Sequence, residues 1–110
     1  MASTTLTLEL PKELQGDPAW RAALHILEHG FPNDARVWKY VDAKRWSIYF
    51  DRMIAGGAWS GGERILLQAT AALFDAEHTV SLWEAGHRMS EAHWTIFLEA
   101  LSLFRDAAGT

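Results

Sequence analysis

The sequence predicts a mainly helical α+β fold, with four to five helices, a small N-terminal β element and a trihelical C-terminal half. Over most of the chain, apolar residues recur three and four positions apart, which is the period of an amphipathic helix. Asp and Ser residues precede these stretches and glycines follow several of them, as helix caps require. One short N-terminal stretch alternates apolar and polar residues, which is typical of a strand.

The β element is expected at residues 4–10, where leucines alternate with Thr and Glu and Pro11 follows. This alternation predicts a strand with one buried face. Residues 36–41 are the best partner within the chain, because they are rich in Val, Trp and Tyr. The resulting sheet is small, and its edge is open to a strand from another chain.

The first helix is expected to begin after Asp17 and to end near Gly30. Asp17 supplies an N-cap, Pro18 a favourable first helical residue and Gly30 a C-terminal stop. Trp20 lies on the apolar stripe of this helix and is expected in the core.

The next segment has two competing interpretations. Asp42 can cap a helix that continues to Gly56, with Trp46 on its apolar stripe and in the core. Residues 46–50 also alternate apolar and polar side chains, which favours a strand that forms a hairpin with residues 36–41. The sequence leaves both interpretations open.

The C-terminal half has the clearest helix signals, because two capping boxes and one further Ser cap precede apolar stretches. These signals are Ser60 with Glu63 before residues 65–74, Ser81 with Glu84 before residues 82–88, and Ser90 before residues 91–106. Four glycines within residues 55–62 make this stretch the natural joint in the chain. A length of 110 residues fits one domain, residues 1–110.

Composition and motifs exclude several classes of function. A net charge of -4 without a basic cluster argues against nucleic acid as a direct partner. No Cys is present, which removes disulfides and suits a reducing compartment such as the cytoplasm. The chain has neither a P-loop sequence for a nucleotide nor a long apolar segment for a membrane. No cofactor is expected.

The three C-terminal helices also resemble a helix-turn-helix unit. A DNA-reading helix presents Arg, Lys, Asn or Gln to the bases. The last helix instead presents Glu91, His93, Thr95 and Glu99. A trihelical arrangement is therefore expected without DNA binding.

The last predicted helix carries more apolar surface than one core-facing stripe. Its polar residues form a narrow stripe that consists of Glu91, Thr95, Glu99, Ser102 and Asp106. Its apolar residues form two rows, one of Trp94, Phe97, Leu98, Leu101 and Phe104, and one of Ile96, Ala100 and Leu103. Such a helix needs cover on two sides. Helices 65–74 and 82–88 could supply that cover, or another chain could.

Six tryptophans in so small a chain favour a binding function, because Trp is a common anchor at protein interfaces. Trp59 lies among glycines, where a contact with Arg64 or exposure to solvent is expected. The predicted partner-binding residues are Trp59, Trp83, Trp94, Phe97 and Phe104. We expect a small protein–protein interaction module, an adaptor or an inhibitor, that binds a protein partner or itself as a homodimer.

The alternative function is a small zinc-dependent hydrolase. Residues 25–29 read His-Ile-Leu-Glu-His, which resembles the H-x-x-E-H signature of the inverzincin metalloproteases. The resemblance implies that His25 and His29 bind the metal and that Glu28 acts as general base. It covers five residues, and these side chains are expected on the solvated face opposite Trp20.

Overall fold

Six α-helices, one 3-10 turn and a two-stranded sheet form residues 8–109, the part of the chain that the computed structural model describes. In chain order the elements are η1 (Lys12–Leu14), α1 (Pro18–Gly30), α2 (Ala35–Trp38), β1 (Val41–Asp42), β2 (Ser47–Ile48), α3 (Phe50–Gly56), α4 (Gly61–Phe74), α5 (Leu82–Arg88) and α6 (Glu91–Ala108). The prediction of a mainly helical fold with a small β element is confirmed. Within these residues there are six α-helices where the sequence predicts four to five, and the short helix α2 was not predicted.

The N-caps predicted at Asp17, Ser60, Ser81 and Ser90 are confirmed, but of the two predicted capping boxes only the one at Ser60 and Glu63 is complete. The Asp17 carboxylate accepts the N–H of the third residue of α1, and Ser60 and Glu63 form the complete capping box of α4. The hydroxyls of Ser81 and Ser90 each accept the N–H at the third position of α5 and α6. Each side chain satisfies a backbone donor that has no partner within its helix. The caps therefore fix where these four helices begin.

The sheet lies elsewhere than predicted. Its two antiparallel strands pair Val41 with Ile48 and Asp42 with Ser47. Residues 4–7 of the predicted N-terminal strand lie outside the described residues, and residues 8–10 are not in a strand. The predicted strand at residues 36–41 is wrong for residues 36–40, which lie in a helix and a turn, and Val41 pairs with Ile48 of β2.

Residues 35–38 form helix α2 although Val37 and Trp38 favour strands. The Asp34 carboxylate caps this short helix by accepting the N–H of Arg36 at 3.0 Å. Val37 and Trp38 are buried, and the Trp38 indole donates a hydrogen bond of 2.8 Å to the buried carbonyl of Phe31. A local cap and tertiary burial thus override the preference of these side chains for a strand.

The competing interpretations of residues 42–56 each prove partly correct. The Asp42 carboxylate accepts the N–H groups two and three residues further on, so it closes the β1–β2 turn and caps no helix. Trp46 follows in this turn with a φ of 51°, and its ring packs edge-on against Trp20 at 5.8 Å between centroids. The helix α3 begins only at Phe50.

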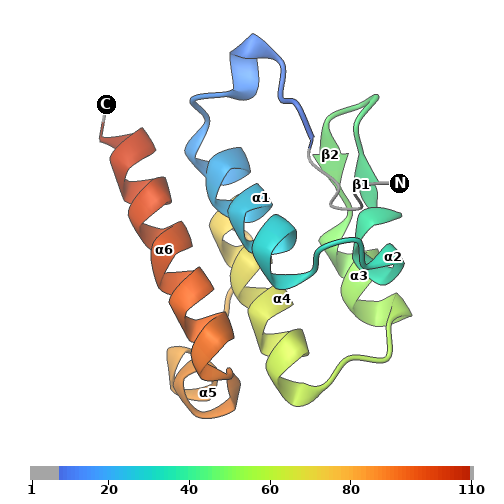
Figure 1. Ribbon diagram of the computed structural model, residues 1–110, viewed down its shortest axis with the longest axis vertical. Coiled ribbons are helices and arrows are strands. Elements are labelled where there is room, and N and C mark those ends of the chain that lie inside the picture. The colour runs from blue at the N-terminus through green and yellow to red at the C-terminus, as the bar shows by residue number, and fades with distance from the viewer. Residues whose placement is uncertain (1–7, 110) are drawn as a thin grey trace, which may run out of the picture.

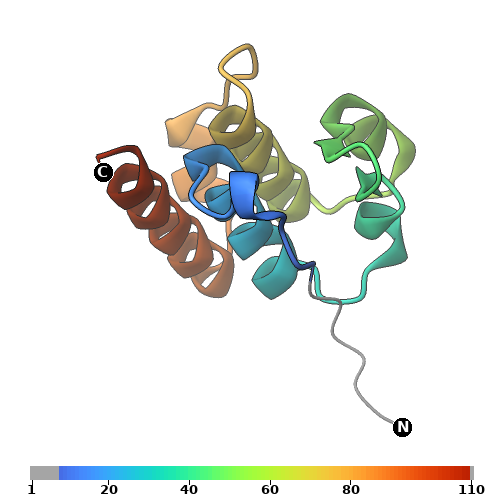
Figure 2. The ribbon, with the colours of Figure 1, turned by 90° about the horizontal axis from the view of Figure 1, so that it is seen from above.

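Helix α1 is the central element of the structure. It packs against two other helices, α6 and α4 (Figure 1). Seen from above, α6 lies at one end of the molecule and α2, α3 and the hairpin lie at the other (Figure 2). The buried residues of α1 are Trp20, Ala22, Ala23, Leu24, Ile26 and Leu27. Helix α1 is therefore largely enclosed by its neighbours, whereas α6 has only Phe97 and Ala100 buried and keeps one face in solvent.

Candidate protein-interaction surface

Large apolar side chains are exposed on two neighbouring helices, α5 and α6. Within the described residues they are Leu82 (66% exposed), Trp83 (70%), Leu98 (44%) and Leu101 (38%). Single exposed apolar residues are ordinary on protein surfaces, but clustered ones mark contact sites. We name Leu82 and Trp83 the α5 corner.

The α5 corner is held in place although it is exposed. The Trp83 indole stacks on the His87 imidazole, with 4.0 Å between ring centroids and 26° between planes. The His87 imidazole is itself held in position, because its Nδ1 atom lies 2.7 Å from the backbone carbonyl oxygen of Trp83. Ala85 of the same helix is buried, and α5 packs on α4. An anchor that is already ordered loses less conformational entropy when a partner binds.

One row on the exposed side of α6, beside its polar stripe, is named here the α6 seam. Its members are Glu91, Trp94, Leu98, Leu101, Arg105 and Ala108. Trp94 is half-buried against the core and its ring lies 5.7 Å from that of Phe97, whereas the other five are exposed. The apolar centre of the seam is therefore flanked by an acidic residue at one end and a basic residue near the other.

The other two predicted anchors of α6 turn toward the protein interior. Phe97 is buried and Phe104 is half-buried against the core. The first apolar row of this helix predicted from the sequence is therefore divided between core and surface. Leu98 and Leu101 face solvent, whereas Phe97 does not. The predicted polar stripe of this helix is exposed along its length.

Trp59 is half-buried and closes the joint between α3 and α4. Its indole N–H lies 3.2 Å from the carbonyl oxygens of both Met53 and Ile54, at the end of α3. Carbonyls in the last turn of a helix need such external donors. A Cβ atom at Gly57 would collide with the indole, so this close approach requires glycine. Trp59 therefore orders residues that the sequence alone marks as the most flexible.

The predicted cation–π contact of Trp59 exists with a different partner. The Arg36 guanidinium lies 4.3 Å from the centroid of the Trp59 ring. Arg36 also bonds Asp34 at 2.7 Å and reaches Glu63 at 3.4 Å. The partner that the sequence predicted, Arg64, lies in the first turns of α4, next to Glu63. A cation from α2 thus connects the Trp59 joint to the start of α4.

These contacts lower the pKa values of two carboxyl groups. The hydrogen bond from the Arg36 side chain holds the pKa of Asp34 below its ordinary value. The pKa of Glu63 is lowered first by the backbone N–H of Ser60 and then by the Arg36 charge. Both groups are more acidic when folded than when unfolded, so each favours the folded state once it is ionised.

Acid is therefore expected to destabilise the protein through Asp34 and Glu63. As the pH falls below about 4.5, the unfolded chain binds protons before the folded chain does, and the free energy of unfolding decreases. The double variant Asp34→Asn, Glu63→Gln should be less stable at pH 7 but should lose less stability on acidification. Urea unfolding at pH 7, 5 and 3.5 measures this, with exposed Asp106→Asn as the control for removing a negative charge. Equal losses in the double variant and the wild type would contradict the assignment.

The His25, Glu28 and His29 side chains of the hydrolase alternative do not form a metal site with other described residues. The His25 Nε2 atom lies 3.0 Å from the Glu99 carboxylate of α6, and the His29 Nδ1 atom lies 2.8 Å from the backbone oxygen of His25. No group of three or more His, Asp or Glu side chains within residues 8–109 is placed to hold a metal ion. The expectation that all three face solvent is wrong for His25, because α6 covers it.

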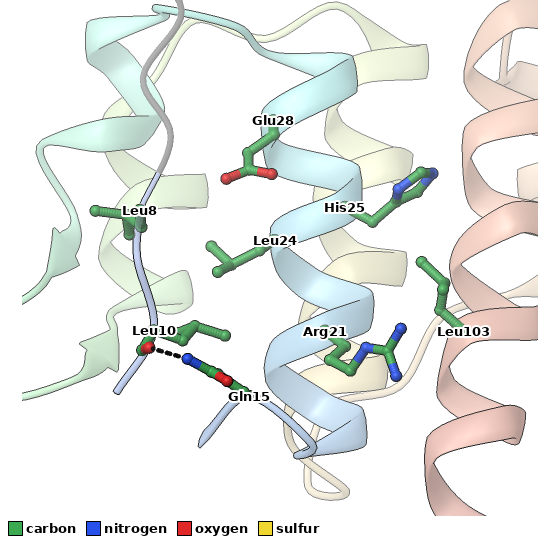
Figure 3. A pocket seen from close by; sticks show the side chains of 8 residues that line it. All are labelled: Leu8, Leu10, Gln15, Arg21, Leu24, His25, Glu28 and Leu103. Atoms are coloured by element: carbon green, nitrogen blue, oxygen red, sulfur yellow. Dashed lines mark hydrogen bonds between the residues drawn. The ribbon is translucent and has the colours of Figure 1, made fainter. Parts of the chain in front are cut away.

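His25 and Glu28 instead line an open groove of about 330 Å³ between the N-terminal segment, α1 and α6 (Figure 3). Its walls carry both apolar and polar side chains, with leucines from three segments beside Arg21, His25 and Glu28. The lining residues are Leu8, Leu10, Gln15, Arg21, Leu24, His25, Glu28 and Leu103. Gln15 donates a hydrogen bond of 3.0 Å to the backbone oxygen of Leu10, which holds one rim.

The fold and the exposed residues thus define a small helical protein with an ordered aromatic corner and a partly apolar helix face. Comparison with protein-family models, with curated proteins and with solved structures finds no match. Among residues 8–109, no helix combines the length and apolar character needed to cross a bilayer. The exposed surface is therefore the feature of the molecule that points to a function.

Sequence reasoning missed three members of this surface. Leu82, Leu98 and Leu101 are exposed, yet none was among the predicted binding residues. The spacing of the α6 seam is visible in the sequence, since its members are alternately three and four residues apart. The spacing does not reveal which row of α6 faces the core, because two apolar rows compete for that position.

Proposed function

We propose that this protein is a small protein–protein interaction module that binds a partner chain through the α5 corner and the α6 seam. The observation that carries the proposal is Trp83, a large aromatic side chain that is 70% exposed and stacked on His87. Trp is strongly enriched among residues whose truncation weakens protein complexes most. A Trp used only for stability would be expected in the core.

The surroundings of Trp83 support the same function. Leu82 adds a second exposed apolar side chain beside it, and Glu84 and Arg88 form an ion pair of 3.1 Å on the same helix. An apolar centre with charged groups around it is the usual composition of a binding site. Trp94 contributes through the α6 seam. The buried Phe97 shapes this surface from beneath, and Trp59 orders the distant joint.

Photo-crosslinking tests the proposal. Trp83 is replaced by the photoreactive residue p-benzoylphenylalanine in the full chain, which is then irradiated in an extract of its source cells. Lys12 is the matched control position, because it is exposed and η1 lies at the opposite end of the molecule from α5 (Figure 1). A protein adduct at position 83 and none at position 12 is expected.

The captured protein is then purified and its affinity is measured. Trp83→Ala should raise the dissociation constant at least about tenfold, as truncation of an interface anchor does. The free energy of unfolding should change by no more than about 0.5 kcal/mol, since the side chain is mainly in solvent. No adduct above the Lys12 control, or an affinity that Trp83→Ala leaves unchanged, would overturn the proposal.

A further inference from the structure

The α6 seam has the spacing of a coiled-coil interface. Its members lie at positions 91, 94, 98, 101, 105 and 108, so the steps along the helix are three, four, three, four and three residues. This alternation places side chains along one line that a second helix can meet. At a rise of about 1.5 Å per residue, the line extends about 25 Å.

The charges of the seam determine which helix direction fits. In an antiparallel pair centred between Leu98 and Leu101, each of these leucines meets the other in the second copy. Arg105 then meets Trp94, a favourable cation–π pair, and Glu91 meets Ala108. In a parallel pair, Arg105 would meet Arg105 and Glu91 would meet Glu91, which are repulsive pairs.

The charged members of the seam are free to form these contacts. Within the described residues, neither Glu91 nor Arg105 takes part in an ion pair. Both are exposed, as are Leu98 and Leu101 between them. The Glu91 carboxylate of one copy would lie one layer from Arg105 of the other. The pattern is therefore complementary to itself under a two-fold rotation.

We propose that a second copy of this chain occupies the α6 seam and that the two α6 helices pair antiparallel, with Leu98 and Leu101 at the centre. This inference rests on the proposed function and names the chain itself as one partner. The contact is shorter than a standard interface, so the dimer is weak and reversible, with a dissociation constant on the order of 10–100 μM.

Sedimentation equilibrium of the full chain between about 5 μM and 1 mM tests the dimer. Leu101→Glu places a carboxylate opposite Leu98 and should raise the dimer dissociation constant at least about tenfold. Ala92→Glu adds the same charge to the same helix at an exposed position outside the seam and should have little effect. Far-ultraviolet circular dichroism checks that both variants remain folded.

The direction of the helices is tested with a spin label. The chain has no Cys, so Glu91→Cys carries a single nitroxide per copy. The antiparallel pair separates the two labels by about 25–30 Å, because residue 91 lies at opposite ends of the seam. A parallel pair would bring them within about 15 Å, and that distance would overturn the proposed geometry.

The outcomes separate this inference from the proposed function. A chain that stays monomeric at 1 mM overturns the dimer, while an adduct at position 83 in the same preparation keeps the interaction module. If Trp83→Ala abolishes dimerisation and Leu101→Glu does not, the dimer contact lies at the α5 corner. That result would overturn the proposed pairing through the α6 seam. Loss of both dimer and adduct would remove both proposals.

Discussion

Replacement of Trp20 by Ala is expected to cost about 3–5 kcal/mol of the free energy of unfolding. Trp20 is 5% exposed, and its ring packs edge-on against Trp46 at 5.8 Å and Phe74 at 5.1 Å. Truncation removes a large buried area and leaves a cavity between α1, the hairpin and α4. Small domains have only about 5–15 kcal/mol in total, so a large part of the Trp20→Ala population should be unfolded in mild urea.

The matched control for this prediction is Trp83→Ala. The two substitutions are chemically identical, but Trp83 is 70% exposed and should cost about 0.5 kcal/mol or less. Urea unfolding followed by circular dichroism measures both. If Trp20→Ala fails to fold, Trp20→Phe provides a smaller, measurable loss. Similar costs at the two positions would mean that the tryptophans are not divided between core and surface.

Replacement of Leu27 by Ala is expected to cost about 2–5 kcal/mol. Leu27 is fully buried in α1, the helix that α4 and α6 enclose. Leu98→Ala makes the same change on α6, where the side chain is 44% exposed, and should cost less than about 1 kcal/mol. Both are measured at about 5 μM so that self-association does not contribute. A larger loss at Leu98 would contradict the central position of α1.

The caps explain why so much of the helical structure is predictable. Asp17, Ser60, Ser81 and Ser90 each accept a backbone N–H within three residues, so the signal and its effect lie in the same short segment. The hairpin lacks such a unique signal. Asp42 accepts N–H groups two and three residues ahead in a turn, and it would also be a suitable helix cap.

The binding surface is less predictable than the helices. Trp83 was predicted as an anchor from its residue type, and the structure places it in solvent. Phe97 belongs to the same apolar stretch as Leu98, yet one is buried and the other exposed. Adjacent positions on a helix are about 100° apart, so a rotation of α6 about its own axis by roughly that angle would exchange them. That rotation is set by α1 and α4, which are distant in sequence.

By itself the sequence determined where α1, α4, α5 and α6 begin, because capping is a local competition for backbone hydrogen bonds. It also determined the surplus of apolar side chains, which composition fixes directly. Only the tertiary structure decided that α1 is the central helix and that Leu98 and Leu101 remain in solvent. Burial depends on which helices meet, and the summed packing of distant segments selects one arrangement among several that local signals allow.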